Sequence, residues 1–288
     1  MLAFALRRLL AAIPTLFFVI LLAFLMMHAA PGGPFDSERT LPPEIEANIA
    51  AAYQLDEPLP VQFFSYLGGV LQGDFGPSFR YRDYTVSELI AGAFPLSIQV
   101  GGLAMLIALM FGIAAGSIAA LYRDSWIDRS IMAVSLTGIS IPVFVVAPLL
   151  VLVFSVSLAW LPAGWSSTAG GARLVLPVIA LALPQIAYIA RLLRASLVDV
   201  LGSDFIRTAR AAGLTSGRIL LRHALKPALL PVISYLGPAV ASILTGSVVV
   251  EQIFGIPGLG QFFVTGALNR DYTLVLGIVV FYACLLYT

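Results

Sequence analysis

FPLSIQVGGLAMLIALMFGIAAGSIAALY, residues 94–122, contains no Asp, Glu, Lys or Arg. Because an α-helix rises about 1.5 Å per residue, roughly 20 apolar residues cross a hydrocarbon core about 30 Å thick, and this stretch is longer than that. Over all 288 residues, 60% are hydrophobic and 11% are charged, whereas soluble domains carry about 25% charged residues. The sequence therefore predicts an all-α, polytopic integral membrane protein.

Five more stretches share this composition, so we expect six transmembrane helices. The first could instead be a cleavable signal peptide, since Arg7 and Arg8 precede it, but its apolar segment exceeds the usual 7–15 residues of such a signal, which favours a retained helix. The sixth ends at Thr288 inside its apolar run, so we expect this helix to be truncated. The further stretches are 9–29, 130–161, 174–190, 227–250 and 272–288.

The basic residues predict the orientation. If the N-terminus is cytoplasmic, the inner segments hold eleven of the sixteen Lys and Arg residues and four of the fifteen acidic residues. Loops rich in Lys and Arg stay on the cytoplasmic side, so we expect both termini there. The formal net charge of +1 is then a cancellation between a basic inner face and an acidic outer face.

The spans divide the chain into three parts. Residues 1–30 form the first helix, 31–93 an outer helical cap, and 94–288 a transmembrane domain with five further spans and an inner loop at 191–226. In the cap, prolines can start a helix over 44–53, and 61–71 is amphipathic. Thr85 and Glu88 fit a capping box that opens the next helix. The cap could be a solvated linker, but its many apolar residues favour a surface that docks a partner.

Several kinds of chemistry are poorly supplied. The single lysine, Lys226, follows Leu225 instead of glycine, so no phosphate-binding loop is present and we expect no ATP bound by this chain. One cysteine, Cys284, and two histidines offer little for a metal site or a disulfide. We therefore expect no catalytic residue, metal or cofactor in this chain. Ion relays of the kind that secondary transporters use are not visible, because no charge lies deep in a span.

Polar residues inside the spans are candidates for lining a solute path. The alternative is that their hydroxyl groups bond back to their own helix or to a neighbour. Pro142, Pro148, Pro177 and Pro184 can also kink or break spans and so serve as gate elements. The candidate path residues are Ser135, Thr137, Ser140, Gln185, Tyr188, Ser242 and Thr245.

The inner loop contains SDFIRTARAAG at residues 203–213. Ser203 or Asp204 can cap a short helix and Gly213 can end it in a left-handed turn, with a second helix starting at Thr215 or Ser216. Phe205, Ala209 and Ala212 would form a stripe with one aromatic anchor among small residues. The arginines beside that stripe, which include Arg210 and Arg222, could simply anchor the loop to anionic lipid.

This inner segment resembles the coupling helix of the inner-membrane permease subunits of binding-protein-dependent ABC importers, which follows a Glu-Ala-Ala then Gly pattern. In Arg207-Thr208-Ala209 and Gly213, the glycine and one alanine match and the acidic position does not. Stretches similar to the dipeptide and oligopeptide branch of that family extend over nearly the whole chain. They are 7–32, GDFGPSF at 73–79, SIPVF at 140–144, HALKPALLP at 223–231, EQIFGIPGLG at 251–260 and NRDY at 269–272.

The resemblance implies the type I ABC importer permease fold in a bacterial inner membrane. It further implies import of oligopeptides delivered by an external binding protein, with a second homologous permease subunit and two ATP-binding subunits that hold ATP and Mg²⁺. No nucleic acid is expected as a partner. The implied contacts to the ATPase are Phe205, Arg207, Thr208, Ala209, Ala212, Gly213, Leu214 and Arg218.

Two alternatives remain open at this point. The same machinery could carry dipeptides, nickel, glutathione or a sugar, or the chain could be a stand-alone ion-coupled carrier or membrane enzyme. The residues expected on the outer face, toward the binding protein, are Asp74, Phe75, Glu251, Phe254, Pro257, Gly258, Arg270 and Asp271.

Overall fold

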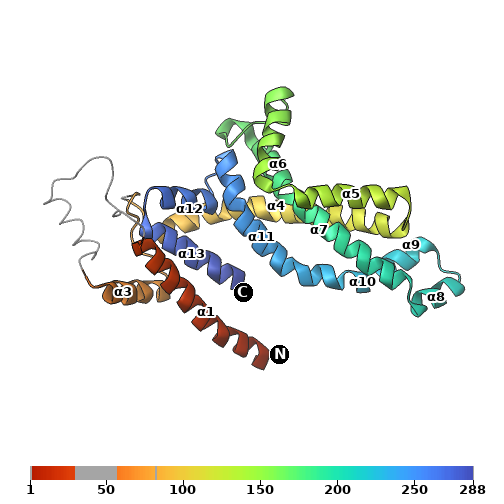
Figure 1. The fold of residues 1–288 in the computed structure, drawn as a ribbon, viewed down its shortest axis with the longest axis horizontal. Helices are drawn as coiled ribbons and strands as arrows, with labels where there is room; N and C mark the ends of the chain where they lie inside the picture. Colours follow the sequence, from red (N-terminus) through yellow and green to blue (C-terminus); the bar gives the residue numbers. More distant parts are fainter. Residues whose placement is uncertain (1, 30–56, 82, 288) are drawn as a thin grey trace. The chain divides into compact units, whose positions relative to one another are not determined.

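The computed structural model describes residues 2–29, 57–81 and 83–287. The predicted outer helix over 44–53 lies outside them. The named elements in the described ranges are all helices (Figure 1). The prediction of an all-α fold is confirmed.

The chain divides into two compact units, residues 1–95 with 257–288, and residues 96–256. Helix α4 (Val86–Leu121) begins in the first unit and continues in the second. The other helices of the first unit are α1 (Leu2–Ala29), α3 (Leu59–Leu71), α12 (Leu259–Leu268) and α13 (Tyr272–Tyr287).

The core of the first unit joins three helices that are far apart in sequence. Ile20 and Phe24 of α1, Phe63 of α3, and Leu276 and Val280 of α13 form one buried cluster. The rings of Phe24 and Phe63 meet edge to face, with centroids 5.4 Å apart. The amphipathic piece predicted over 61–71 is therefore a helix that packs against the first and last helices of the chain.

The start of α4 is fixed by a reciprocal cap. The amide and hydroxyl of Thr85 both donate to Glu88 Oε2 at 2.9 Å, and the Glu88 amide donates back to Thr85 Oγ1 at 3.2 Å. Each side chain thereby satisfies a first-turn amide that the helix leaves unpaired. The predicted capping box is confirmed.

Helix α7 (Val175–Leu201) forms the centre of the second unit. It packs on α5 (Trp126–Ser140), α6 (Val143–Leu150) and α11 (Leu230–Phe254). It contributes buried residues to two apolar clusters of this unit. The remaining segments are the π-helical η1 (Val151–Ser157), the 3₁₀-type η2 (Ser167–Leu174), α8 (Asp204–Ala211), α9 (Ser216–Arg218), the π-helical η3 (Ile219–Ala224) and α10 (Leu225–Ala228).

Close packing of α4 on α7 depends on two glycines. A Cβ on Gly112 would lie 2.8 Å from Ile189 Cβ, and one on Gly116 would lie 2.6 Å from the carbonyl oxygen of Ala190. Both distances are shorter than van der Waals contact. Small residues four positions apart allow helix backbones to approach in this way inside membranes.

The count of six spans is not confirmed within the described residues. Four helices there are long and apolar enough to cross a membrane, or five if a bent pair counts as one. The sixth predicted span is α13, whose 16 residues extend about 24 Å at the usual rise. That length falls short of a typical hydrocarbon core.

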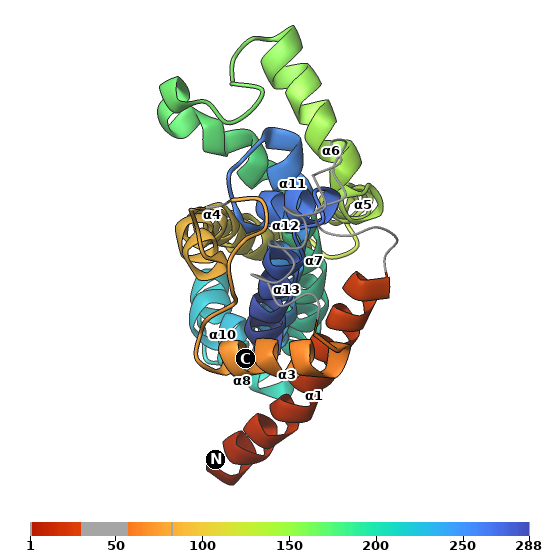
Figure 2. The same ribbon diagram turned by 90° about the vertical axis from the view of Figure 1, so that its left-hand side faces the viewer.

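The third predicted span, 130–161, is broken instead of straight. Its two halves, 126–140 and 143–157, meet at an angle of 102° (Figures 1 and 2). The break falls at Pro142, which has no amide hydrogen, and the preceding Ile141 is extended. Proline disfavours the helical conformation at the residue before it. Of the four prolines considered as gate elements, Pro142 is the one that ends a helix, whereas Pro184 lies inside the continuous α7.

Candidate coupling, path and outer sites

The predicted inner helix is α8, and its ends form as the sequence indicates. Ser203 occupies the cap position in an extended conformation, although its hydroxyl donates back to the Val200 carbonyl at 2.6 Å. At the other end Gly213 has φ +79°, and its amide donates to the Arg210 carbonyl at 3.0 Å. This left-handed turn reverses the chain toward α9, so the predicted helix-turn-helix is present.

One residue of α8 that the sequence stripe omitted holds the helix to the bundle. Ile206 is completely buried in a cluster with Ile189, Leu193 and Leu197 of α7 and with Ile219 of η3. The periodicity could have revealed it, because Ile206 and Ala209 are three residues apart and face the same side.

The opposite side of α8 is open. Phe205 is 52% exposed, and Thr208 and Ala212 are exposed beside it, at i+3 and i+7. The half-buried Ala209 and Leu214 instead pack against the cluster around Ile206. The predicted stripe is therefore divided between two faces. The exposed face, which we call the exposed face of α8, consists of Phe205, Thr208 and Ala212.

The charged side chains of this segment form an exposed ion pair. Arg207 Nη1 lies 3.2 Å from Asp204 Oδ1, and both side chains are largely exposed. Exposed pairs of this kind contribute little to stability, so the Arg207 guanidinium can change partner at small cost. Arg218 is exposed as well.

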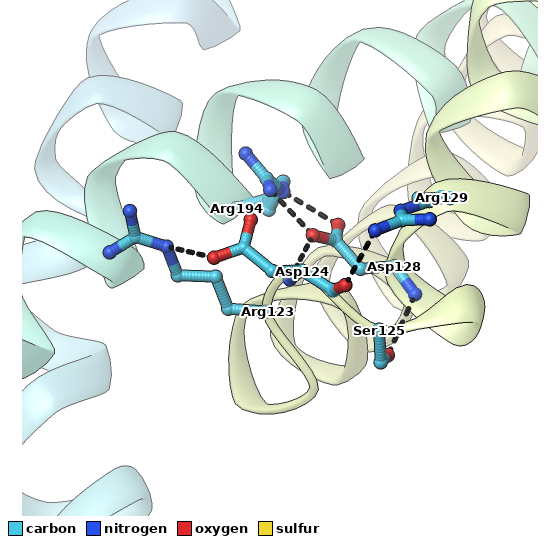
Figure 3. A network of polar contacts seen from close by, with 6 residues as sticks. All are labelled: Arg123, Asp124, Ser125, Asp128, Arg129 and Arg194. Atoms are coloured by element: carbon cyan, nitrogen blue, oxygen red, sulfur yellow. Dashed lines mark hydrogen bonds and ion pairs between the residues drawn. The ribbon is translucent and has the colours of Figure 1, made fainter.

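A buried ion pair between α5 and α7 lies in the same unit (Figure 3). Arg194 donates from Nε to Asp128 Oδ1 at 2.7 Å and from Nη2 to Asp128 Oδ2 at 2.5 Å. The Asp124 amide adds a third bond to Asp128 at 2.9 Å. The Asp128 side chain is 3% exposed and that of Arg194 is 28% exposed. Sequence reasoning missed this pair because 66 residues separate its members and no local pattern connects them.

Three of the candidate path residues come together between α7 and α11. Gln185 donates to Ser242 Oγ at 3.3 Å and accepts from the Tyr235 hydroxyl at 2.9 Å. The rings of Tyr188 and Tyr235 stack with centroids 4.1 Å apart. Tyr235 completes the group; it was not selected from the sequence, although it is a polar residue inside the predicted span 227–250.

Three other candidate path residues have hydroxyl groups that bond back to their own helices. Thr137, Ser140 and Thr245 each donate a hydroxyl to a carbonyl four residues earlier in their own helix, at 3.0, 2.8 and 3.0 Å. Ser135 is buried in α5. The hydroxyl groups of Thr137, Ser140 and Thr245 are satisfied locally, which is a common arrangement of Ser and Thr in membrane helices.

In the first unit, Asp271 brings two of the recognised stretches together. Its carboxylate accepts from Ser78 Oγ at 2.5 Å and from the amides of Phe79, Arg80 and Leu274, each at 3.2 Å. Asp271 is completely buried. It therefore fixes the GDFGPSF loop against the start of α13, instead of facing a partner.

The other residues expected on the outer face differ in exposure. Asp74 is exposed and accepts the Gly76 amide at 2.8 Å. Phe75 and Arg270 are half-buried. The remaining four are Pro257, which is exposed, and Gly258, Glu251 and Phe254, which are buried.

Two of these buried residues hold a loop within the second unit. The Phe254 carbonyl accepts the Trp165 amide at 2.7 Å, and the Glu251 carbonyl accepts the Ile256 amide at 2.9 Å. Fewer of these residues are therefore available to a partner than the sequence analysis predicted. Among the described residues, no group of three His, Cys, Asp or Glu residues is placed to hold a metal ion.

Comparison with known proteins agrees with this arrangement. Residues 112–288 match the family described as binding-protein-dependent transport system inner membrane component, and residues 1–100 match the N-terminal part of such components. The chain belongs to this family. It is accordingly an inner membrane component of a transport system, as its apolar helices indicate.

Curated relatives cover almost the whole chain. The oligopeptide transport system permease protein OppB of Salmonella typhimurium is 56% identical over 97% of this chain and 92% of its own length. The dipeptide transport system permease protein DppB of Bacillus subtilis is 43% identical over 98% and 91%. These relatives confirm the resemblance to the dipeptide and oligopeptide branch.

A solved structure shows the fold. The MetNI methionine ABC transporter, in inward-facing conformations, matches 68% of this chain and 91% of its own chain with a TM-score of 0.55 and 17% identity. The type I importer permease fold is therefore confirmed.

Proposed function

We propose that this chain is the B-type permease subunit of an ATP-driven importer of oligopeptides. The observation that carries this proposal is the 56% identity to an oligopeptide permease over nearly the whole chain. Identity to the dipeptide permease is lower, at 43%. The cargo is tested by uptake of a labelled tetrapeptide into vesicles that contain the assembled transporter. Unlabelled tetrapeptide should compete, and effective competition only by a dipeptide, nickel, glutathione or a sugar would refute the assignment.

The partners follow from a binding-protein-dependent system. We propose a second homologous permease subunit, an external peptide-binding protein and two ATP-binding subunits that hold ATP and Mg²⁺. The excess of basic residues in the inner segments supports a cytoplasmic location for both termini. A stand-alone carrier would accumulate peptide in vesicles that lack the ATP-binding subunits, so sustained uptake there would contradict this proposal.

The exposed face of α8 is the proposed contact with an ATP-binding subunit. Phe205 supplies an aromatic anchor, and the small side chains of Thr208 and Ala212 permit close approach. The inward Ile206 joins α8 to α7, so a displacement of the helix reaches a spanning element. Gly213 shapes the turn, and Arg207 and Arg218 add charge at its edge.

The variant Phe205→Ala tests the contact. A matched control is Leu221→Ala, because Leu221 is also an exposed apolar residue, in η3. We expect Phe205→Ala to lower co-purification of the ATP-binding subunits and peptide uptake about tenfold or more, as for an interface anchor. The control should keep both. Equal behaviour of the two variants would contradict the assignment.

A second variant, Gly213→Pro, tests the turn. Proline cannot adopt φ +79° and lacks the amide that bonds to Arg210. We expect it to uncouple ATP hydrolysis from peptide. If peptide-stimulated hydrolysis and uptake both stay at the parent level, α8 is not the coupling helix.

A further inference from the structure

A second feature of the inner segment is a cavity of about 370 Å³ beside α8. Its walls come from the last turns of α4 and α7, the end of α8 and the start of α9 and η3. Two arginines, Arg123 and Arg210, lie in its lining together with the hydroxyl-bearing Ser216. The other lining residues are Ala120, Leu121, Val198, Leu201, Gly202 and Ile219.

The charged residues that line this cavity are all basic. None of the lining residues is acidic, and all of them lie in the described part of the chain. Arg123 has an acidic neighbour, since its Nε lies 3.2 Å from Asp124 Oδ2 (Figure 3), but both side chains are more than half exposed. Such a pair is weak. The lining therefore combines two arginines with mostly apolar residues and has no acidic residue of its own.

Aromatic residues flank the cavity where an apolar helix ends. The apolar helix α4 ends at Leu121, and the next residues include Tyr122 and Trp126, both exposed large aromatic side chains on either side of Arg123. Trp and Tyr concentrate at the membrane–water interface. A lining that combines basic and apolar residues, next to aromatic residues typical of that interface, matches a molecule with a charged head and apolar chains.

We propose that this cavity binds the phosphate group of an anionic phospholipid. The planar guanidinium groups of Arg123 and Arg210 can each donate two hydrogen bonds to phosphate oxygens. The acyl chains would continue along Leu121, Val198 and Leu201 toward the hydrocarbon core. Because Arg123 follows α4 and Arg210 lies in the last turn of α8, one lipid would join the inner end of a spanning helix to α8.

The test is lipid binding to the full chain purified in neutral detergent, measured by native mass spectrometry with phosphatidylglycerol or phosphatidylcholine added. The variants are Arg123→Gln, Arg210→Gln and their combination. Arg222→Gln is the matched control, because Arg222 is an exposed arginine of η3 outside the lining. The double variant Arg123→Lys with Arg210→Lys keeps the charge.

We expect each glutamine variant to weaken phosphatidylglycerol binding about fivefold, as for one basic residue near a membrane surface. The combination should weaken it roughly 25-fold if the two contributions add, the lysine variant much less, and Arg222→Gln less than twofold. Phosphatidylcholine should bind weakly to all, and inorganic phosphate at millimolar concentration should not displace phosphatidylglycerol.

Two results would overturn the proposal. If Arg222→Gln reduces binding as much as either cavity variant, the lipid is held by diffuse surface charge. If inorganic phosphate displaces the lipid completely, the cavity is a site for a free anion. Neither result affects the proposed oligopeptide cargo, which is tested separately by uptake.

Discussion

Removing Arg194 is the sharpest test of how the second unit is held together. Arg194→Gln would leave the Asp128 carboxylate, 3% exposed, with one backbone donor at 2.9 Å in place of the two guanidinium bonds. Breaking a buried ion pair from one side typically costs 3–5 kcal/mol. Because Arg194 is 28% exposed and partly hydrated, we expect the lower end, about 3 kcal/mol of unfolding free energy.

The reverse change should cost less. Asp128→Asn leaves a guanidinium that water can reach, so we expect a loss of about 2 kcal/mol. In a double-mutant cycle the two changes should couple by about 2 kcal/mol, since each removes the partner of the other. Arg191→Gln is the matched control, one turn earlier on α7 and exposed, with an expected effect under about 0.5 kcal/mol.

The assay is reversible unfolding of the purified chain in mixed micelles by added SDS, followed by circular dichroism. The reasoning is refuted if Arg191→Gln and Arg194→Gln lose the same free energy, or if the coupling energy is near zero. Either result would mean that the bidentate geometry in Figure 3 contributes nothing to the packing of α5 on α7.

Three further changes follow from close contacts. Gly116→Ala should destabilise the chain by about 1–3 kcal/mol in the same SDS titration, because its Cβ would meet the Ala190 carbonyl at 2.6 Å. The control is Gly102→Ala, which should be neutral or slightly stabilising because nothing lies within 4 Å of the added Cβ. Asp271→Asn should cost about 2–3 kcal/mol, since an amide nitrogen would face donors, whereas the exposed Asp74→Asn should cost under about 1 kcal/mol by thermal unfolding. Tyr235→Phe should leave the Gln185 oxygen without its 2.9 Å partner and cost about 1 kcal/mol; a larger effect on peptide uptake than on stability would support a path role.

Sequence alone predicted what depends on local composition and spacing. Residues within a few positions of one another produce the helical class, the capping box at Thr85 and Glu88, and the left-handed turn at Gly213. The interactions that form these features can therefore be read from a short stretch of sequence. The same is true of α3, whose apolar face is visible in its periodicity.

The missing parts depend on contacts between distant residues. Asp128 and Arg194 form a pair across 66 positions, and Ser78 and Asp271 across 193. Pro142 was visible as a possible break, but the 102° bend also depends on how α6 packs against α7 and α11. No short window of sequence contains that information.

The end of the second unit that carries α8 has the connections needed to transmit a displacement. Ile206 fixes α8 to α7 through a completely buried apolar contact, and Arg194 fixes α7 to α5 through a bidentate ion pair. Closely packed interiors shift as rigid pieces and resist continuous deformation. A force on Phe205, at the exposed face of α8, would therefore reach α5 and α7 together. The bend at Pro142, at the far end of α5 from this ion pair, is where that motion could change the direction of the broken segment.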